Sequence, residues 1–400
     1  MTSPRRASVL AAALAGVLAA TFTYTAAPAA PVSAGTRTVA ASAALPPVQQ
    51  VKEDLTAQLV RTLQDEPARR AFLNAIVRAG QANLLTVIAD SGSAAAVEFS
   101  RLARDANDRI ISLKGLDGMD GSVLRVRLAD PAMARQIEAG SEPLVAASPA
   151  DARREGTFPA YDLAGRQVDL DLARVPEVPV VLVELDEEAV SRVGLRVLSA
   201  ELVALGVDSD LVAGDDEVRE TDGDSRQPAG VARMTAAGSQ YAATRLDRIW
   251  LADDEEPWWK GAAEIYGLVM GQGKNGKGRT DVIDMPYLDY DHRWYLPHQQ
   301  LVNWSNFKWN AVDLLLMEED DGTNYKAIAK TVVGAVGALF GFGAYVPLIG
   351  FVLAALPDSW FTDDDDYVDS FYMLSRELSG DLTGARPNAR IRISPVTVTS

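Results

Sequence analysis

Three runs of acidic residues, each following an apolar stretch, constrain the fold of this chain most strongly. The first run, residues 253–256, follows the apolar stretch 244–252, and the second, residues 318–321, follows 311–317. The third run is residues 363–366. Strands joined by acidic or glycine-rich loops are typical of an antiparallel sandwich, in which alternate loops gather at one end. We therefore predict a β-sandwich in the C-terminal part of the chain.

Carboxylates that converge from several loops repel one another unless a cation lies between them. Calcium takes about 6–8 oxygen ligands, which carboxylates, carbonyls and water all provide. The alternative for each run is a solvated acidic surface, because surface acids also keep proteins soluble. If the loops converge, we predict a calcium site with the candidate ligands Asp253, Asp254, Glu264, Glu318, Asp320 and Asp365.

Three segments around these acids share a recognisable pattern. Residues 245–254 have the sequence RLDRIWLADD, residues 261–266 have GAAEIY, and residues 312–321 have VDLLLMEEDD. Together they resemble strands and loops of the C2 family of calcium-binding sandwiches. In that family an acidic ligand lies two residues before a tyrosine, and Glu264 matches that position. The resemblance implies a C2-like sandwich with calcium held by its loops.

A second resemblance covers most of the chain that follows residue 34. It rests on residues 256–266 (EPWWKGAAEIY), 284–289 (DMPYLD) and 358–369 (DSWFTDDDDYVD). These segments resemble an uncharacterised family of secreted bacterial proteins that is known only as a domain of unknown function. The resemblance implies export and no particular chemistry.

The N-terminus has the composition of an export signal. Arg5 and Arg6 form a basic start, residues 9–20 are apolar, and small residues precede a cleavage position after Ala34. The apolar stretch is too short for a permanent membrane anchor. We predict a signal peptide at 1–34 and therefore a secreted protein.

Composition excludes several classes of function. The chain has no cysteine, which excludes zinc–thiolate sites, iron–sulfur clusters, thiol catalysis and a lipid-anchored N-terminal cysteine. Its formal net charge of −17 argues against binding nucleic acid, because phosphates are neutralised by lysine and arginine. The expected partner is a protein, a glycan or another cell-surface molecule.

The periodicity of apolar residues changes along the chain and predicts a multi-domain α+β fold. Helical spacing dominates up to residue 121, and alternating or continuous apolar runs follow it up to residue 205. Residues 206–238 are rich in Asp, Glu, Gly and Ser and have no apolar period. The predicted parts are a linker (35–47), a helical module (48–121), a small α+β module (122–205), an acidic linker (206–238) and the sandwich (239–400).

An apolar insert interrupts the predicted sandwich. Residues 331–356 form an uncharged stretch that is long enough to span a bilayer. Pro347 and several glycines divide the stretch into two halves, and neither half alone would span. We predict a helical hairpin packed on the sandwich. Membrane insertion and a partner-binding patch are the alternatives.

The two histidines offer a catalytic alternative. Asp289, Asp291 and His292 lie close together in sequence, and His298 follows. Such groups serve in acid–base chemistry, so the runner-up function is a secreted hydrolase that uses Asp289, Asp291 and His292, with a glycan as one substrate. The glycine pattern at 271–276 does not precede an apolar helix and is interpreted as a hairpin loop. The favoured function is an exported, non-catalytic binding protein with a calcium site.

Overall fold

The structure is a computed structural model with a mixed α+β fold, as predicted. It contains seven α-helices and three β-sheets within the described residues. The predicted signal peptide and the candidate ligands Asp254 and Asp365 lie outside these residues. The described residues are 46–150, 156–215, 218, 220–221, 240–253, 258–261, 263–337, 346–355 and 367–399.

The N-terminal helices begin and end at capping residues. The Asp65 carboxylate accepts a backbone hydrogen bond at the start of α2, and Ser93 Oγ does the same for α3. Gly80 ends α2 with a φ of 71°, a left-handed conformation that favours glycine. The range 48–121, predicted as a helical module, includes most of α1 (Pro47–Thr62) and all of α2 (Glu66–Ala79) and α3 (Ala94–Leu113).

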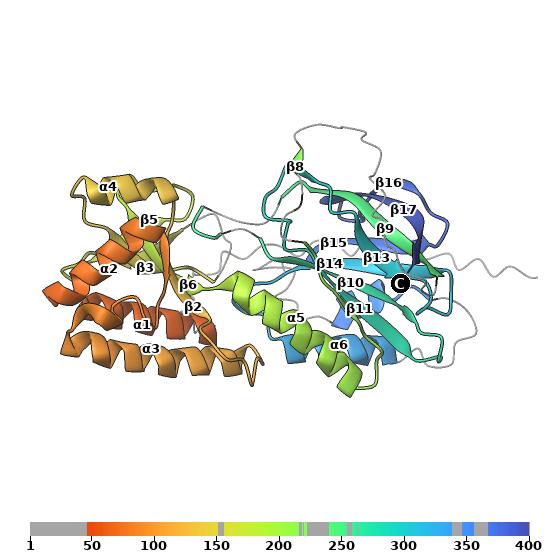
Figure 1. The fold of residues 1–400 in the computed structure, drawn as a ribbon, viewed down its shortest axis with the longest axis horizontal. Helices are drawn as coiled ribbons and strands as arrows, with labels where there is room; N and C mark the ends of the chain where they lie inside the picture. Colours follow the sequence, from red (N-terminus) through yellow and green to blue (C-terminus); the bar gives the residue numbers. More distant parts are fainter. Residues whose placement is uncertain are drawn as a thin grey trace, which may run out of the picture. The chain divides into compact units, whose positions relative to one another are not determined.

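The first sheet contains both parallel and antiparallel strand pairs and lies beside these helices (Figure 1). Its order is β1-β2-β6-β3-β4-β5, and only β3 and β6 run parallel. β6 is buried along its whole length, which is typical of a continuous β-branched run. The short helix α4 (Ala134–Glu138) lies between β2 and β3 in sequence. The strands are β1 (Gln81–Asn83), β2 (Leu124–Leu128), β3 (Leu144–Ala147), β4 (Thr157–Tyr161), β5 (Gln167–Asp171) and β6 (Val180–Leu185).

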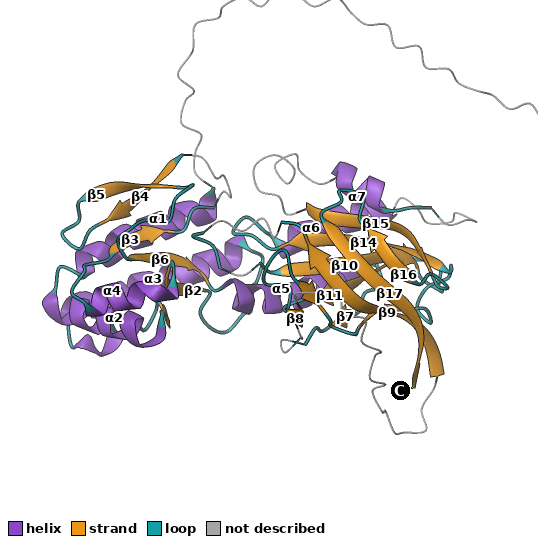
Figure 2. Ribbon diagram, turned by 90° about the horizontal axis from the view of Figure 1, so that it is seen from above, coloured by secondary structure: helices purple, strands orange, loops and turns teal. Residues whose placement is uncertain are grey.

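Two further sheets form the C-terminal part (Figure 2). The second has the order β15-β14-β10-β11-β7, and the third has β16-β17-β9-β12-β8, with β13 also paired to β9. The strands are β7 (Leu211–Val212), β8 (Glu220–Thr221), β9 (Gln240–Leu251), β10 (Ile265–Gln272), β11 (Gly278–Asp284), β12 (Trp294–Tyr295), β13 (Gln299–Asn303), β14 (Ala311–Glu318), β15 (Tyr367–Ser375), β16 (Gly380–Thr383) and β17 (Ala389–Thr399).

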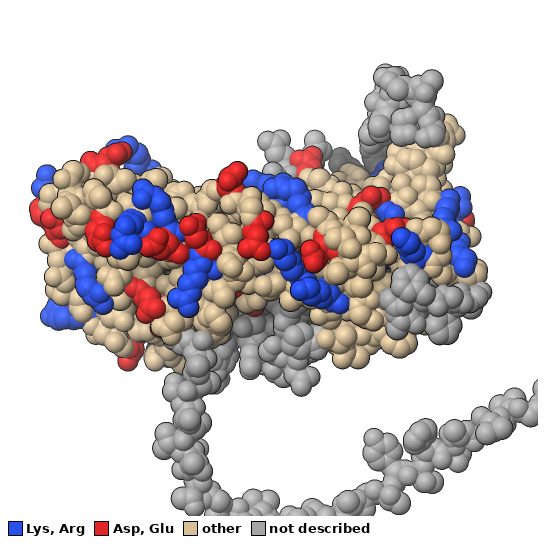
Figure 3. Space-filling model, turned by 90° about the horizontal axis from the view of Figure 1, so that it is seen from below, with Lys and Arg blue, Asp and Glu red and all other residues tan. Residues whose placement is uncertain are grey.

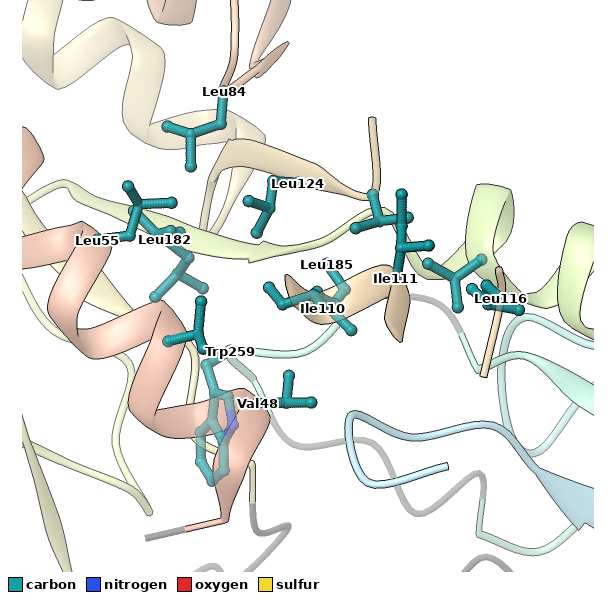
Figure 4. Close-up of a cluster of buried hydrophobic side chains, with 14 of the residues drawn as sticks. Val48, Leu55, Leu84, Ile110, Ile111, Leu116, Leu124, Leu182, Leu185 and Trp259 are labelled. Carbon is teal, nitrogen blue, oxygen red and sulfur yellow. The ribbon is translucent and has the colours of Figure 1, made fainter. Parts of the chain in front are cut away.

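The second sheet contributes side chains to two apolar clusters. Val269 and Leu314 belong to a cluster shared with the third sheet, which includes Ile249. Their neighbours Leu268 and Leu315 belong to a cluster shared with the helices and the first sheet. Because both faces are covered, β10 and β14 are buried without alternation. Figure 4 shows part of the larger cluster, including Val48, Leu182 and Trp259.

The apolar insert contributes two helices, α6 (Tyr325–Gly337) and α7 (Ile349–Ala355). α6 packs against α5 (Glu187–Ala204). A Cβ on Gly194 of α5 would lie 1.9 Å from Tyr325 Cζ, so a glycine is needed there to leave room for the buried ring. In α7, Val352 is buried and Phe351 is exposed. No helix in the described part of the chain combines the length and the apolar character needed to cross a membrane.

The predicted acidic linker at 206–238 contains two short paired strands. β7 pairs parallel with β11, and β8 pairs antiparallel with β12. The range Leu45–Ser400 forms one compact unit. The predicted module boundaries within this range stay predictions.

Candidate functional site

The acidic run at 318–321 is buried rather than solvated. Glu318 is 3% exposed and Glu319 is 1% exposed. β14 pairs with β10, and Glu319 N donates a hydrogen bond to the Glu264 carbonyl at 3.0 Å. On the face shown in Figure 3, by contrast, exposed charges of both signs are interspersed. The structure therefore brings three predicted ligands, Glu264, Glu318 and Asp320, onto neighbouring positions.

Two buried lysines from the N-terminal helices reach this run. Lys114, at the end of α3, places Nζ 2.5 Å from Glu319 Oε1 and donates to the Asp320 carbonyl at 2.6 Å. Lys52 of α1 donates to the Asp321 carboxylate. Both lysines are 0% exposed. A buried ammonium ion requires such partners. Removing it from water costs on the order of several kcal/mol, and an unpaired ion recovers none of this.

A third lysine approaches from the segment before β10. Lys260 Nζ lies 3.7 Å from Glu318 Oε1, and its side chain is 8% exposed. The three ammonium groups provide the positive charge that the sequence argument assigned to calcium. Within the described residues, no group of three or more histidine, aspartate or glutamate side chains is arranged to hold a metal ion. The calcium site stays a prediction.

Asp253 lies on a different sheet from the other described candidates. It follows β9 of the third sheet, whereas Glu264 and Glu318 flank the paired strands β10 and β14 of the second. Its backbone N donates to Asn388 Oδ1 at 2.9 Å, and its carbonyl accepts from Asn388 Nδ2 at 3.0 Å. These bonds join the end of β9 to the start of β17.

A pocket of about 560 Å³ opens beside the buried carboxylates and is called here the Glu264 pocket. β2 provides arginines, α5 provides a glutamate and an arginine, and the segments around β10 and after β11 complete the wall. The volume suits a small molecule. Its charged lining residues are Arg125, Arg127, Arg192, Lys260, Glu188, Glu264, Asp284 and Asp289.

The two arginines of β2 differ in how many of their N–H groups donate hydrogen bonds. Glu184 accepts two hydrogen bonds from Arg127, at 2.7 and 2.8 Å, and one from Arg125 Nε at 2.6 Å. Arg127 Nη2 also donates to the Trp259 carbonyl at 2.8 Å. Arg125 Nη2 has no hydrogen-bond partner among the residues that the structure describes, and it faces Gly261 on the pocket wall. Arg125 Nη1 lies 3.5 Å from Asp186 Oδ1, so Nη2 is the donor group of Arg125 that is directed at the pocket wall.

Glu264 presents a carboxyl group with unused hydrogen-bonding capacity. The residue is partly exposed at the pocket wall, but Oε2 is out of contact with solvent and has no hydrogen-bond partner in the described part of the chain. Burial raises the pKa of this carboxyl well above its usual range, and the carboxyls of Glu187 and Glu319 raise it further, although Arg125 lowers it. The raised pKa favours the protonated form of this carboxyl, which is able to donate a hydrogen bond.

A family model described as "Protein of unknown function (DUF3103)" matches residues 53–400. The chain belongs to the DUF3103 family. This confirms the predicted resemblance to a domain of unknown function, whereas the C2-like resemblance stays a prediction. No curated protein and no solved structure matches the chain. The match includes all the described residues that line the Glu264 pocket.

The DUF3103 domain retains protons in this region because its buried acids outnumber their ammonium partners. Burial raises the pKa of Glu187 to about 7, although Lys260 lowers it. Burial also raises the pKa of Glu319 to about 8 despite the neighbouring Lys114. We call this group the acid–lysine cluster; it comprises Glu187, Glu264, Glu318, Glu319, Asp321, Lys52, Lys114 and Lys260.

The pKa of Lys114 moves in the direction expected for a paired ammonium group. Burial alone would lower it, but the carboxylates of Glu319, Asp320 and Asp321 together raise it above its ordinary value. Lys114 therefore remains charged while its partners share the available protons.

Several residues of the DUF3103 site were not found by sequence reasoning. The alternation of arginine in the strand 124–128 (LRVRL) was a usable signal, because it places Arg125 and Arg127 on one face. Lys52 and Lys114 gave no signal, since each lies in an ordinary amphipathic helix.

The structure does not place the three residues of the predicted histidine site together in one pocket. Asp289 lines the Glu264 pocket, but Asp291 and His292 are not among the described residues of its wall. His292 Nδ1 lies 3.0 Å from Asp291 Oδ2, and the histidine side chain is 68% exposed. Only one of the three proposed hydrolytic residues therefore lines this pocket.

Proposed function

We propose that this protein is an exported binding protein that takes a small ligand with an anionic oxygen group into the Glu264 pocket. The supporting observation is that Arg125 and Glu264 line the same pocket. Arg125 Nη2 is a donor, and the raised pKa of Glu264 favours the protonated form, which also donates. A carboxylate or phosphate group accepts hydrogen bonds from both, and a guanidinium adds charge to the contact. Lys260 adds a second positive charge to the same wall.

Small anions test this proposal directly. We expect inorganic phosphate or succinate to raise the melting temperature of the wild type, because an anion bound at 100 times its Kd adds about 2.7 kcal/mol to the free energy of unfolding. Glucose, which is neutral, should have no such effect. Arg125→Gln should remove the shift, with each variant compared to itself without ligand. Arg101→Gln, on the exposed face of α3, is the matched control.

The protonation of Glu264 adds a second criterion. Affinity for the anion should fall as the pH rises through the elevated pKa of Glu264, because the ionised carboxylate repels the ligand. Glu264→Gln should remove this part of the pH dependence while keeping a donor. The proposal fails if neither anion raises the melting temperature, or if Arg125→Gln leaves the shift unchanged.

Calcium binding by the acidic runs remains a separate proposal, supported by the sequence pattern around Asp253 and by the C2-like resemblance. Because lysines already face Glu318 and Asp321, Asp253 is the described candidate ligand on which this proposal chiefly rests. Calcium should then raise the melting temperature, a chelator should reverse the rise, and Asp253→Asn should remove it. Equal curves with calcium and with chelator would rule the site out.

A hydrolytic function is the second candidate, and the location of Asp289 favours it. Ala263 N donates to the Asp289 carbonyl at 3.4 Å, which joins Asp289 to the segment that carries Glu264. Acid–base hydrolysis of glycosides uses two carboxyl groups in one pocket, and Glu264 and Asp289 both line this one. Turnover of a chromogenic glycoside that Asp289→Asn abolishes would favour this candidate over simple binding.

A further inference from the structure

A lysine and an aspartate that lie 269 residues apart in sequence meet in the interior of the protein. Lys52 Nζ donates a hydrogen bond to Asp321 Oδ2. Lys52 is 0% exposed, and Asp321 is 5% exposed. Asp321 Oδ1 is also buried, and it has no hydrogen-bond partner among the residues that the structure describes. The charged form of this pair is therefore costly, because one carboxylate oxygen carries charge without a donor or water beside it.

The other acceptors that Lys52 contacts are neutral, and its surroundings are apolar. Nζ donates to the Ser148 carbonyl at 2.8 Å and to Ser148 Oγ at 2.9 Å. Val48, one turn before Lys52 on α1, lies beside Trp259 in the larger apolar cluster (Figure 4). Such surroundings favour a neutral amine and a neutral carboxylic acid over two ions.

The carboxyl of Glu187 lies close enough to that of Asp321 for the two to interact. Glu187 is in the first turn of α5 and is 7% exposed. Burial raises the pKa of Glu187 to about 7; Lys260 lowers it, and the carboxylate of Asp321 raises it. A carboxyl group with such a pKa can both accept and donate a proton at neutral pH.

We propose that Lys52 and Asp321 are joined by an isopeptide bond and that Glu187 transfers the protons of the reaction. The Lys52 ammonium group first gives a proton to the Asp321 carboxylate, which leaves an amine and a carboxylic acid. Nζ then attacks Cγ, so that a C–N bond forms and the C–OH bond breaks. Glu187 takes a proton from the nitrogen and gives one to the departing hydroxyl group. One water molecule is released, and no oxidant is needed. Contact between the two groups gives them the high effective concentration that favours an intramolecular reaction.

This bond ties α1 to the segment that follows β14. The chain has no cysteine, so a disulfide cannot supply such a cross-link. A cross-link that closes a long loop restricts the unfolded chain strongly. The neighbouring pair of Lys114 and Glu319 stays ionic, because nearby carboxylates raise the pKa of Lys114 and keep its amine protonated. The proposal does not depend on ligand binding in the Glu264 pocket.

Mass spectrometry of the denatured full chain tests the proposal. We expect the wild type to be lighter, by one water molecule, than the mass calculated from its N-terminal residue onward. Cyanogen bromide cleaves after methionine, so the fragment that ends at Met119 and the fragment 318–373 should stay joined in denaturant. Lys52→Arg keeps the positive charge but removes the nucleophilic amine. This variant should have its full mass and separate fragments.

Further measurements identify the residues that are joined. The pairs Lys114–Glu319 and Lys326–Asp117 connect the same two fragments. Lys326→Arg is the matched control and should keep the joined fragments, and tandem mass spectrometry of the joined peptides should locate the bond at Lys52. Glu187→Gln should leave most of the freshly purified protein at full mass, because a proton-transferring group accelerates such reactions by about 10²–10⁴-fold.

The wild type alone can overturn the proposal, whatever the variants do to the fold. A full mass for the wild type would show that Lys52 and Asp321 form only an ion pair. Joined fragments that persist in Lys52→Arg, or a bond located at another lysine, would also overturn it. Joining that is equally complete in Glu187→Gln would overturn the role of Glu187.

Discussion

Replacing Lys114 with methionine lowers the free energy of unfolding by about 3–5 kcal/mol, the loss typical of removing one partner from a buried ion pair. Methionine fills a similar volume, so the loss reports charge and hydrogen bonding rather than a cavity. The change leaves Glu319 without its 2.5 Å contact and the Asp320 carbonyl without its 2.6 Å hydrogen bond. Urea denaturation at pH 9 measures the loss, because Glu319, whose pKa is raised to about 8 by burial, is ionised at that pH.

Two controls make this result specific. Lys326→Met removes an ion pair with Asp117 that is largely exposed, and we expect a far smaller effect because water screens that pair. The double change Lys114→Met with Glu319→Gln should recover part of the lost stability, since no unpaired carboxylate is then left when the pH rises. A loss as small as that of Lys326→Met would show that the buried pair contributes nothing to stability.

Raising the pH from 6 to 9 should destabilise the protein by about 2–4 kcal/mol through the acid–lysine cluster. An unfolded glutamate has a pKa near 4.5, whereas folding raises the pKa of Glu187 to about 7 and that of Glu319 to about 8. Between about pH 4.5 and about pH 8 the folded state therefore binds more protons than the unfolded state. The free energy of unfolding therefore falls as the pH rises, and the loss is complete above about pH 8.

Denaturant titrations at pH 6, 7, 8 and 9 measure this slope. Glu319→Gln cannot ionise, so it should flatten the curve and leave the variant relatively more stable at pH 9. Glu98→Gln, at an exposed position on α3, is the matched control and should keep the wild-type slope. A wild-type curve that is level or rises between pH 6 and 9 would contradict the raised pKa values.

Local patterns in the sequence predicted much of the fold. Helical spacing of apolar residues up to residue 121 indicated the part of the chain that contains α1, α2 and α3. The apolar runs that follow, up to residue 205, include β6, which is buried along its whole length. Such features depend on residues within a few positions of one another, so they can be recognised without knowing how the chain folds back on itself.

The site was predicted only in part, because its charges are balanced over long sequence distances. The C2-like resemblance pointed to Glu264 and Glu318, which the pairing of β10 and β14 does bring together. The counter-charge could not be foreseen, because Lys52 lies 269 residues from Asp321 and Lys114 lies 206 from Asp320. An acidic run followed by a loop has the same local pattern whether it faces water, a metal ion or a buried lysine.

By itself, the sequence established a mixed α+β class and a family resemblance that the DUF3103 match confirms. Only the tertiary structure decided that the acids of 318–321 are buried with lysines and that Glu264 shares a pocket with Arg125. The physical reason is that secondary structure follows from short-range periodicity, whereas the ionisation of a buried carboxyl depends on which distant charges the fold places beside it.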